Sequence, residues 1–408
     1  MTKTLVLVSL LQAQAVEWPQ FRGPRRDGVS AETGLLKAWP EGGPKVVWQA
    51  KGIGGGYASV SISGGKVFTL GNSKGKSFVH ALDLEKGQLL WSAEVGKQGG
   101  NLGSTPTVDG DRLYAVGQEG DFVCVETATG KVAWRKSFFG DFGGKYGGWH
   151  YTESPLVDGD LVFGTPGGRD SMVALDKKTG EVAWTCSLPS GEAAGYSSIV
   201  IAEVGGVRMC VQLLADSLVG VEAKTGKLLW RYGEAGGKFS RNTANIPTPI
   251  VKGDLVFCAA GYGRGAGLVR LVPKEGGIQA EEVYFSKELT NKHGGVILVG
   301  DHVYGDRDDR GNPFCADFKT GKIVEGWKAR SETAGKGSVA VTAADGHLYF
   351  RYENGHVALV PADPAGYKEA ASFVVPKGKG PSWAHPVVAG GRLYLREQDA
   401  LWCYELRP

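Results

Sequence analysis

The sequence predicts an all-β protein in which one unit of short strands is repeated around a ring. The first observation is the abundance of glycine: 64 residues lie mainly between short apolar runs, where tight turns need positive φ. The second is a recurring turn. Its copies are ALDLEKGQLLW (81–91), CVETATGKVAW (124–134), ALDKKTGEVAW (174–184), GVEAKTGKLLW (220–230) and CADFKTGKIVEGW (315–327). Repeats of this length are typical of solenoids and propellers.

The tryptophans set the period of the repeat. Trp91, Trp134, Trp184 and Trp230 are separated by 43, 50 and 46 residues. Tyr284 occupies the next slot, and a further tryptophan follows it. This spacing fits a blade of four strands.

Each unit has two halves. The first is a hairpin such as TPTVDGDRLYAVG (105–117), with a glycine turn between runs of alternating apolar residues. In the second half, Asp176 can cap its own turn and Gly180 supplies the left-handed position. Trp184 then falls on the outermost strand, where a large ring can cover the joint with the next blade.

Counting units predicts a single eight-bladed propeller of four-stranded antiparallel blades, with seven blades as the alternative. The last unit, 382–408, lacks a fourth strand, and KVVWQA (45–50) can supply it from the N-terminus. Such closure would remove two exposed sheet edges. The predicted blade-docking tryptophans are Trp48, Trp91, Trp134, Trp184, Trp230 and Trp327.

The N-terminal region predicts export. Residues 1–15 contain Lys3, an apolar run and Ala13-Gln14-Ala15, the pattern of a signal peptide. This segment is too short to span a bilayer. We therefore expect an extended, solvated arm at 16–44 and a propeller at 45–408, in the periplasm or secreted, and no transmembrane segment.

The charge and the cysteine pattern limit the kinds of partner and cofactor that we expect. The chain has 46 basic and 43 acidic residues, a formal net charge of +3, and beyond Arg22, Arg25 and Arg26 no basic cluster that would indicate nucleic-acid binding. Its six cysteines form no C-x-x-C motif. Most lie in apolar runs, so we expect buried free thiols, although an even number in an exported protein leaves a disulfide open. We expect a monomer.

The A-x-D-x-x-T-G-x-x-x-W repeat resembles that of the quinoprotein-type propellers, the PQQ-like repeat family, over residues 45–408. EWPQFRGPRRDGVSAETGLL (17–36) resembles the mature N-terminus of exported bacterial PQQ-binding-like repeat proteins. The resemblance implies tryptophan docks between blades and two branches of function. One branch contains PQQ-dependent alcohol and glucose dehydrogenases; the other is a propeller lipoprotein of the outer-membrane assembly machinery, which binds partners. This chain lacks the vicinal cysteines of the first and the lipidated cysteine of the second.

Candidate site residues lie in the loops just before each innermost strand, because these loops converge on the mouth of a propeller's central channel. They are rich in polar and aromatic residues. The candidate ligand-binding residues are His150, Tyr151, Glu153, Tyr196, Arg241, Asn242, Asn245, Lys292, His293, Trp383 and His385.

Three functions compete for this site. The favoured hypothesis is an exported binding or scaffold protein for a protein, peptide or glycan, with no cofactor, no metal and no assigned catalytic residue. The alternative is an oxidoreductase acting on an alcohol or sugar with PQQ and Ca²⁺. Arg241 and Lys292 would then hold the PQQ carboxylates, and Glu153 with Asn242 or Asn245 the cation. A polysaccharide hydrolase or lyase would need paired carboxylates, and only Glu153 is placed suitably.

Two other segments leave alternatives open. GDRDDRGN (305–312) is dense in aspartate, but Arg310 occupies a position where a calcium loop needs Asp or Asn. We interpret it as a solvated loop. The glycine-rich insertion at 136–151 is either a lid over the channel or a connector.

Overall fold

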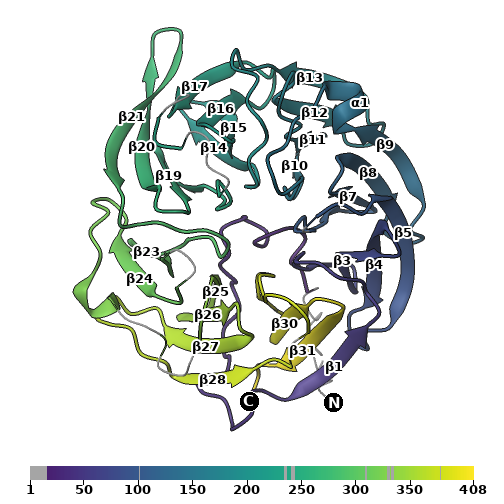
Figure 1. Ribbon diagram of the computed structural model, residues 1–408, viewed down its shortest axis with the longest axis vertical. Coiled ribbons are helices and arrows are strands. Elements are labelled where there is room, and N and C mark those ends of the chain that lie inside the picture. The colour runs from purple at the N-terminus through teal and green to yellow at the C-terminus, as the bar shows by residue number, and fades with distance from the viewer. Residues whose placement is uncertain are drawn as a thin grey trace, which may run out of the picture.

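The blades form a closed ring around a central axis (Figure 1). The computed structural model describes residues 16–100, 102–233, 237–239, 244–307, 310–328, 331, 335–376 and 378–408. Across these ranges, seven antiparallel sheets have four strands and one has three. The eight-bladed prediction is confirmed, and the seven-bladed alternative is wrong.

The first seven blades are each a continuous stretch of chain that runs from the innermost strand outward. Blades one to three are β2 (Ser61–Ser63), β3 (Lys66–Ser73), β4 (Lys76–Asp83), β5 (Leu89–Lys97); β6 (Thr107–Asp109), β7 (Arg112–Val116), β8 (Asp121–Glu126), β9 (Val132–Ser137); and β10 (Leu156–Asp158), β11 (Leu161–Gly164), β12 (Met172–Asp176), β13 (Val182–Cys186). Blades four and five are β14 (Val200–Val204), β15 (Val207–Leu213), β16 (Leu218–Glu222), β17 (Leu228–Tyr232); and β18 (Ile250–Lys252), β19 (Leu255–Ala260), β20 (Gly265–Lys274), β21 (Gly277–Ser286). Blades six and seven are β22 (Ile297–Val299), β23 (His302–Asp306), β24 (Pro313–Asp317); and β25 (Val339–Ala344), β26 (His347–Tyr352), β27 (His356–Pro361), β28 (Ala371–Val374).

The eighth blade joins the two ends of the chain. It contains β29 (Val387–Ala389), β30 (Arg392–Glu397), β31 (Ala400–Glu405) and, outermost, β1 (Val46–Lys51). The last two strands pair antiparallel, with Trp48 opposite Cys403. The strand predicted from KVVWQA therefore closes the ring by pairing with the last strand of the chain.

The sixth blade departs from the four-stranded prediction. After β24 the chain makes one isolated bridge at Ile323 and then a 3₁₀ turn, η1 (Glu325–Trp327). The physical reason lies in the sequence: the segment from the turn glycine to the tryptophan is two residues longer than in ALDKKTGEVAW. The extra residues are taken up by the 3₁₀ turn. Trp327 is still buried, and its indole N–H donates to the Asp363 carbonyl at 2.8 Å.

The repeated motif seals the joints between blades. The Asp176 carboxylate accepts from the Thr179 backbone N–H at 2.8 Å, and Gly180 has φ 75°. A Cβ on Gly180 would lie 2.8 Å from the ring of Trp134 in the preceding blade, so glycine is required there. The Trp134 indole N–H donates to the Lys177 carbonyl at 3.1 Å. Trp48, Trp91 and Trp184 donate in the same way to Leu84, Thr127 and Ala223.

The joint between blades four and five is different. The indole nitrogen of Trp230 lies 3.2 Å from the sulfur of Met209 instead of a turn carbonyl in the next blade. Blade five lacks the T-G turn, because its third and fourth strands, β20 and β21, continue into a hairpin that projects from the ring (Figure 1). Trp230 instead packs in a buried cluster that includes Leu271 and Ile278 of this blade.

The N-terminal arm crosses the central opening of the ring (Figure 1). Trp18 bridges Ile62 in blade one, and Val29 bridges Ala343 in blade seven. The expectation of a solvated arm is wrong for two of its arginines: Arg22 is 4% exposed and Arg26 5%. Both are buried because their guanidinium groups donate to backbone carbonyls of the blades.

Six buried cysteines are free of disulfides: Cys124, Cys186, Cys210, Cys258, Cys315 and Cys403. None of the helices within the described ranges has the length and apolar character needed to cross a bilayer.

Candidate functional site

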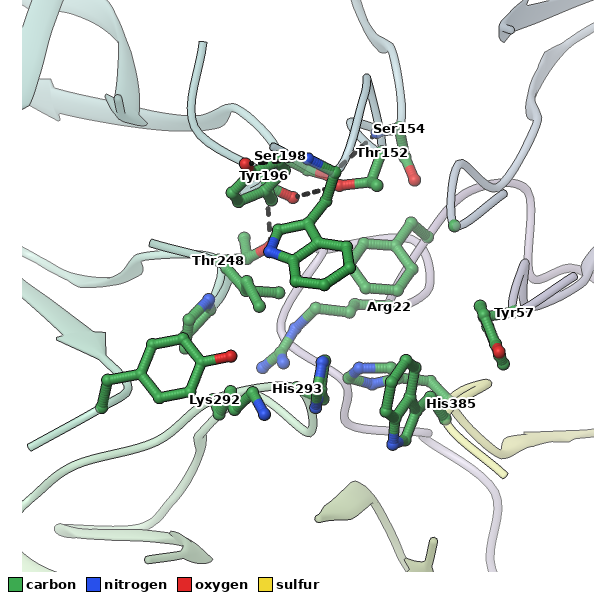
Figure 2. A pocket seen from close by; sticks show the side chains of 18 residues that line it. Arg22, Tyr57, Thr152, Ser154, Tyr196, Ser198, Thr248, Lys292, His293 and His385 are labelled. Carbon is green, nitrogen blue, oxygen red and sulfur yellow. Dashed lines mark hydrogen bonds between the residues drawn. The ribbon is translucent and has the colours of Figure 1, made fainter. Parts of the chain in front are cut away.

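A cavity at the axis of the ring has a volume of about 190 Å³. The loops that precede the innermost strands of seven blades line it, as predicted, and Phe21 and Arg22 of the N-terminal arm also contribute. Figure 2 shows Arg22 among Thr248, His293 and His385, which come from three different blades. The cavity is therefore built by many blades together with a segment from outside them.

A chain of hydroxyl groups connects blades one to five around this axis. The backbone N–H of Ser59 donates to Oγ1 of Thr105 at 3.0 Å, and that of Thr105 to Oγ of Ser154 at 2.9 Å. The backbone N–H of Ser154 donates to Oγ of Ser198 at 3.0 Å, and that of Ser198 to Oγ1 of Thr248 at 3.4 Å. Sequence reasoning missed this feature. Its signal was a Ser or Thr shortly before the inner strand of each of the first five blades, as in GSTPT and GYSSI.

The chain of hydroxyls ends at blade six, where the corresponding residue is Gly295. The Arg22 guanidinium lies beside it: a Cβ on Gly295 would be 2.7 Å from Arg22 Nη1. Arg22 Nη2 donates to the carbonyls of Val296 at 2.7 Å and Asp27 at 3.1 Å. Burial lowers the pKa of Arg22 to about 10, so the group is still a cation at neutral pH.

Five of the predicted site residues line the cavity: Tyr196, Lys292, His293, Trp383 and His385. The rings of His293 and Trp383 are stacked, with centroids 3.9 Å apart. The Lys292 ammonium lies 4.7 Å from the centre of the Tyr262 ring. Burial, with a contribution from the nearby Arg22, lowers the pKa of His385 to about 3, so its imidazole is neutral at physiological pH.

Three other predicted residues point into the blade wall. Tyr151 is buried, and its hydroxyl donates to the Pro166 carbonyl at 2.7 Å. Both carboxylate oxygens of Glu153 accept hydrogen bonds from Thr165, at 2.7 and 2.8 Å. Burial raises the pKa of Glu153 to about 8. The side-chain amide of Asn245 donates to the carbonyls of Leu214, Ala215 and Phe239.

Of the last three predicted residues, one lies outside the cavity lining and two lie outside the described residues. His150 has φ 64°, and its Nδ1 lies 2.8 Å from Oε1 of Glu119, outside the cavity lining. Arg241 and Asn242 lie outside the described residues, as do Asp308 and Asp309 of the aspartate-rich loop.

The insertion at 136–151 is anchored to the blades. It contains α1 (Phe138–Phe142), capped by the Ser137 hydroxyl, which accepts from the Gly140 N–H at 3.0 Å. Phe138 and Phe142 are buried. The insertion brings Trp149, which is 47% exposed, to the edge of the cavity.

PQQ with Ca²⁺ does not fit the residues described at this cavity. No Asp or Glu is among the described lining residues, and the part of the chain that the structure describes contains no group of three metal-ligating side chains. Both oxygens of Glu153, the predicted calcium ligand, are already bonded to Thr165. The cavity of about 190 Å³ is also below the roughly 300 Å³ at which typical cofactor pockets begin.

The chain forms eight blades, and a repeated tryptophan motif closes most of the joints between them. This arrangement is that of a PQQ-like β-propeller. Within that class, the family model described as "Outer membrane protein assembly factor BamB" matches residues 75–329, more than half of the chain. The chain belongs to this family, and the predicted resemblance is confirmed.

Individual relatives are distant. The outer membrane protein assembly factor BamB of Kangiella koreensis is 27% identical over 227 residues, which cover 51% of this chain and 49% of the relative. That of Shewanella oneidensis is 26% identical over 282 residues, 64% of this chain and 66% of the relative. A tetrathionate hydrolase of Acidithiobacillus ferrooxidans is 22% identical over 329 residues, 78% of this chain and 53% of the relative. The chain thus spans about half the length of the first of these relatives.

Solved structures share the fold at low identity. BamB from Moraxella catarrhalis has a TM-score of 0.64 and 13% identity, covering 89% of this chain and 100% of that one. The quinohemoprotein alcohol dehydrogenase from Comamonas testosteroni has a TM-score of 0.66 and 14% identity, covering 95% and 80%. At these identities the likeness concerns the fold alone.

Proposed function

We propose that this protein is a binding or scaffold protein of the bacterial cell envelope, and that it holds a polypeptide partner. The observation that carries the proposal is the family match over residues 75–329. Several relatives are named as assembly factors for outer membrane proteins, which supports a protein partner over a glycan. The proposal includes export with removal of residues 1–15, a periplasmic location and a monomeric propeller.

The mouth of the ring is the surface we assign to the partner. Trp149 is 47% and Tyr262 52% exposed there, and both line the cavity. Exposed aromatic side chains are enriched where proteins bind proteins. The loops that carry them are fixed to a rigid ring, which is the usual arrangement for a recognition surface. The oxidoreductase alternative has support only from a shared fold, and the described cavity residues do not fit its cofactor.

Site-directed photo-crosslinking tests this proposal. A photoreactive amino acid would replace Trp149 or Tyr262 in the full chain, produced in its own host. We expect covalent adducts of discrete mass with envelope proteins, identified by mass spectrometry.

The matched controls are Leu89 and Val182, which are 52% and 48% exposed on the outer strands. Adducts equally abundant at the control positions, or none at the mouth, would contradict the proposed surface. Detection of the full-length precursor in the cytoplasm alone would contradict export.

A further inference from the structure

The base of the axial cavity contains a buried cation with an unused donor. Arg22 lines the cavity and is 4% exposed, and within the described residues its buried Nη1 has no hydrogen-bond partner. Its other donors are engaged: Nε with the Arg26 carbonyl at 3.3 Å, and Nη2 with two further carbonyls. Leaving a buried charged donor without a partner is costly, so the site favours an acceptor from outside the chain.

No carboxylate of the described lining neutralises this cation. The acidic residue that raises the pKa of Arg22 is Asp27, and its carboxylate accepts from Nε of Arg25 at 2.8 Å. Lys292 adds a second positive charge at the cavity wall. The electrostatics of the cavity therefore favour an anion, and a guanidinium is well shaped to bind a carboxylate.

The walls are suited to one aromatic ring. Tyr57 and Trp383 are in contact, with centroids 4.8 Å apart, and Tyr196 and Trp149 contribute from the opposite blades. The volume of about 190 Å³ exceeds the roughly 150 Å³ of a cavity known to hold benzene. The space is thus sufficient for a single ring and too small for a large cofactor.

We propose that the axial cavity binds an organic carboxylate that carries one aromatic ring. The carboxylate bonds to Nη1 of Arg22, and the ring packs among the aromatic walls. Two sources share this chemistry: a free aromatic acid, or the C-terminal residue of a polypeptide. The proposal goes beyond the scaffold function and does not depend on it, since a propeller without a protein partner would still have this cavity.

Isothermal titration calorimetry on the full chain tests the proposal with matched ligands. The probes are N-acetyl-phenylalanine and its C-terminal amide, which differ only in the negative charge. We expect the acid to bind and the amide to bind at least about tenfold more weakly, as for loss of a charged hydrogen bond. Equal affinities, or no binding of the acid at millimolar concentration, would overturn the proposal.

Two further ligands distinguish the sources. These are 3-phenylpropionate and the peptide Gly-Gly-Phe with a free C-terminus. Tighter binding of the peptide indicates a polypeptide C-terminus, and tighter binding of 3-phenylpropionate a free acid. Because the crosslinking experiment concerns the exposed mouth, failure of that test and failure of this one are distinguishable.

Substitutions locate the carboxylate. Gly295→Ala would place a methyl group 2.7 Å from Nη1 of Arg22, where the ligand must approach. Its control is Gly253→Ala, which has a similar positive φ, 61° against 66°, and nothing within 4 Å of the added atom. We expect at least tenfold weaker binding of the acid in the first variant and unchanged binding in the second.

The charge is tested directly by Arg22→Gln, with the exposed Arg25→Gln as control. The first should abolish the preference for acid over amide, and the second should keep it. If both glycine variants bind like the unmodified protein and Arg22→Gln retains the preference, the carboxylate lies elsewhere and the inference is wrong.

Discussion

The outer joints of the ring and its central axis are built in opposite ways. At the joints, the same atoms meet repeatedly: an indole N–H donates to a turn carbonyl, and the ring covers a turn glycine, as for Trp134 and Gly180. At the axis, the repeat is broken. Five blades are linked through Ser or Thr hydroxyls, whereas blade six has Gly295 and receives Arg22 from the arm.

This difference separates structure from recognition. A contact made in the same way at many joints adds stability wherever it occurs and selects no ligand. A ligand site needs a position at which the blades differ. Here that position is Gly295 of blade six, which has no hydroxyl group and lies beside the buried guanidinium of Arg22. The following predictions address the joints first and the axis afterwards.

The largest effect is expected at a joint. Trp184→Ala removes a buried ring that covers Gly226 and donates to the Ala223 carbonyl at 3.0 Å. The space left by the missing ring should lower the free energy of unfolding by about 3–5 kcal/mol, measured by chemical denaturation. Trp184→Phe keeps a ring but loses the indole N–H, so it should cost clearly less. Equal losses would mean that the hydrogen bond, and not the packing, seals the joint.

The next effect concerns the arm at the axis. Arg26 donates to the carbonyls of Ser154 at 2.7 Å and Pro155 at 2.8 Å. Arg26→Ala removes both charged bonds and leaves the carbonyls without these donors, so we expect a loss of about 2–3 kcal/mol. Hydrogen exchange of residues 16–34 should also accelerate.

The control for the arm is Arg25→Ala. The Arg25 side chain is 60% exposed, forms an ion pair with Asp27 and donates to the Val29 carbonyl at 3.4 Å, and exposed pairs contribute little. Its stability and exchange should match the unmodified protein. Faster exchange in both variants would show that the arm is held by something other than the buried cation.

The joints were predictable from sequence because each is made by two consecutive copies of one short motif. Asp176, Gly180 and Trp184 lie within one motif, and the geometry of the turn fixes where the ring must fall. The number of blades followed from the period, and the closing strand from the missing fourth strand of the last unit. The missing fourth strand of blade six had a visible cause in its two extra residues.

The axis was predicted only in outline. The loops that line the cavity were found, but the direction of each side chain within a loop was not readable, so Glu153 and Asn245 were expected to face the channel and instead bond within the wall. Arg22 was assigned to solvent because arginines in a terminal arm are usually exposed. Its burial depends on the carbonyl of Val296, 274 residues away, and no local pattern contains that information.

The smallest effect tests whether the hydroxyls at the axis are equivalent. Ser198→Ala removes the acceptor of the buried Ser154 N–H, 3.0 Å away, and should cost about 1–2 kcal/mol because a buried donor loses its partner. Ser198→Thr restores a hydroxyl and should recover most of the stability, since the chain itself uses Thr105 and Thr248 at the same position in two other blades. Denaturation of the two variants side by side measures the difference. If Ser198→Ala is as stable as the unmodified protein, this hydroxyl does not contribute to the joining of the blades. The absence of a hydroxyl at Gly295 would then not distinguish blade six from the others.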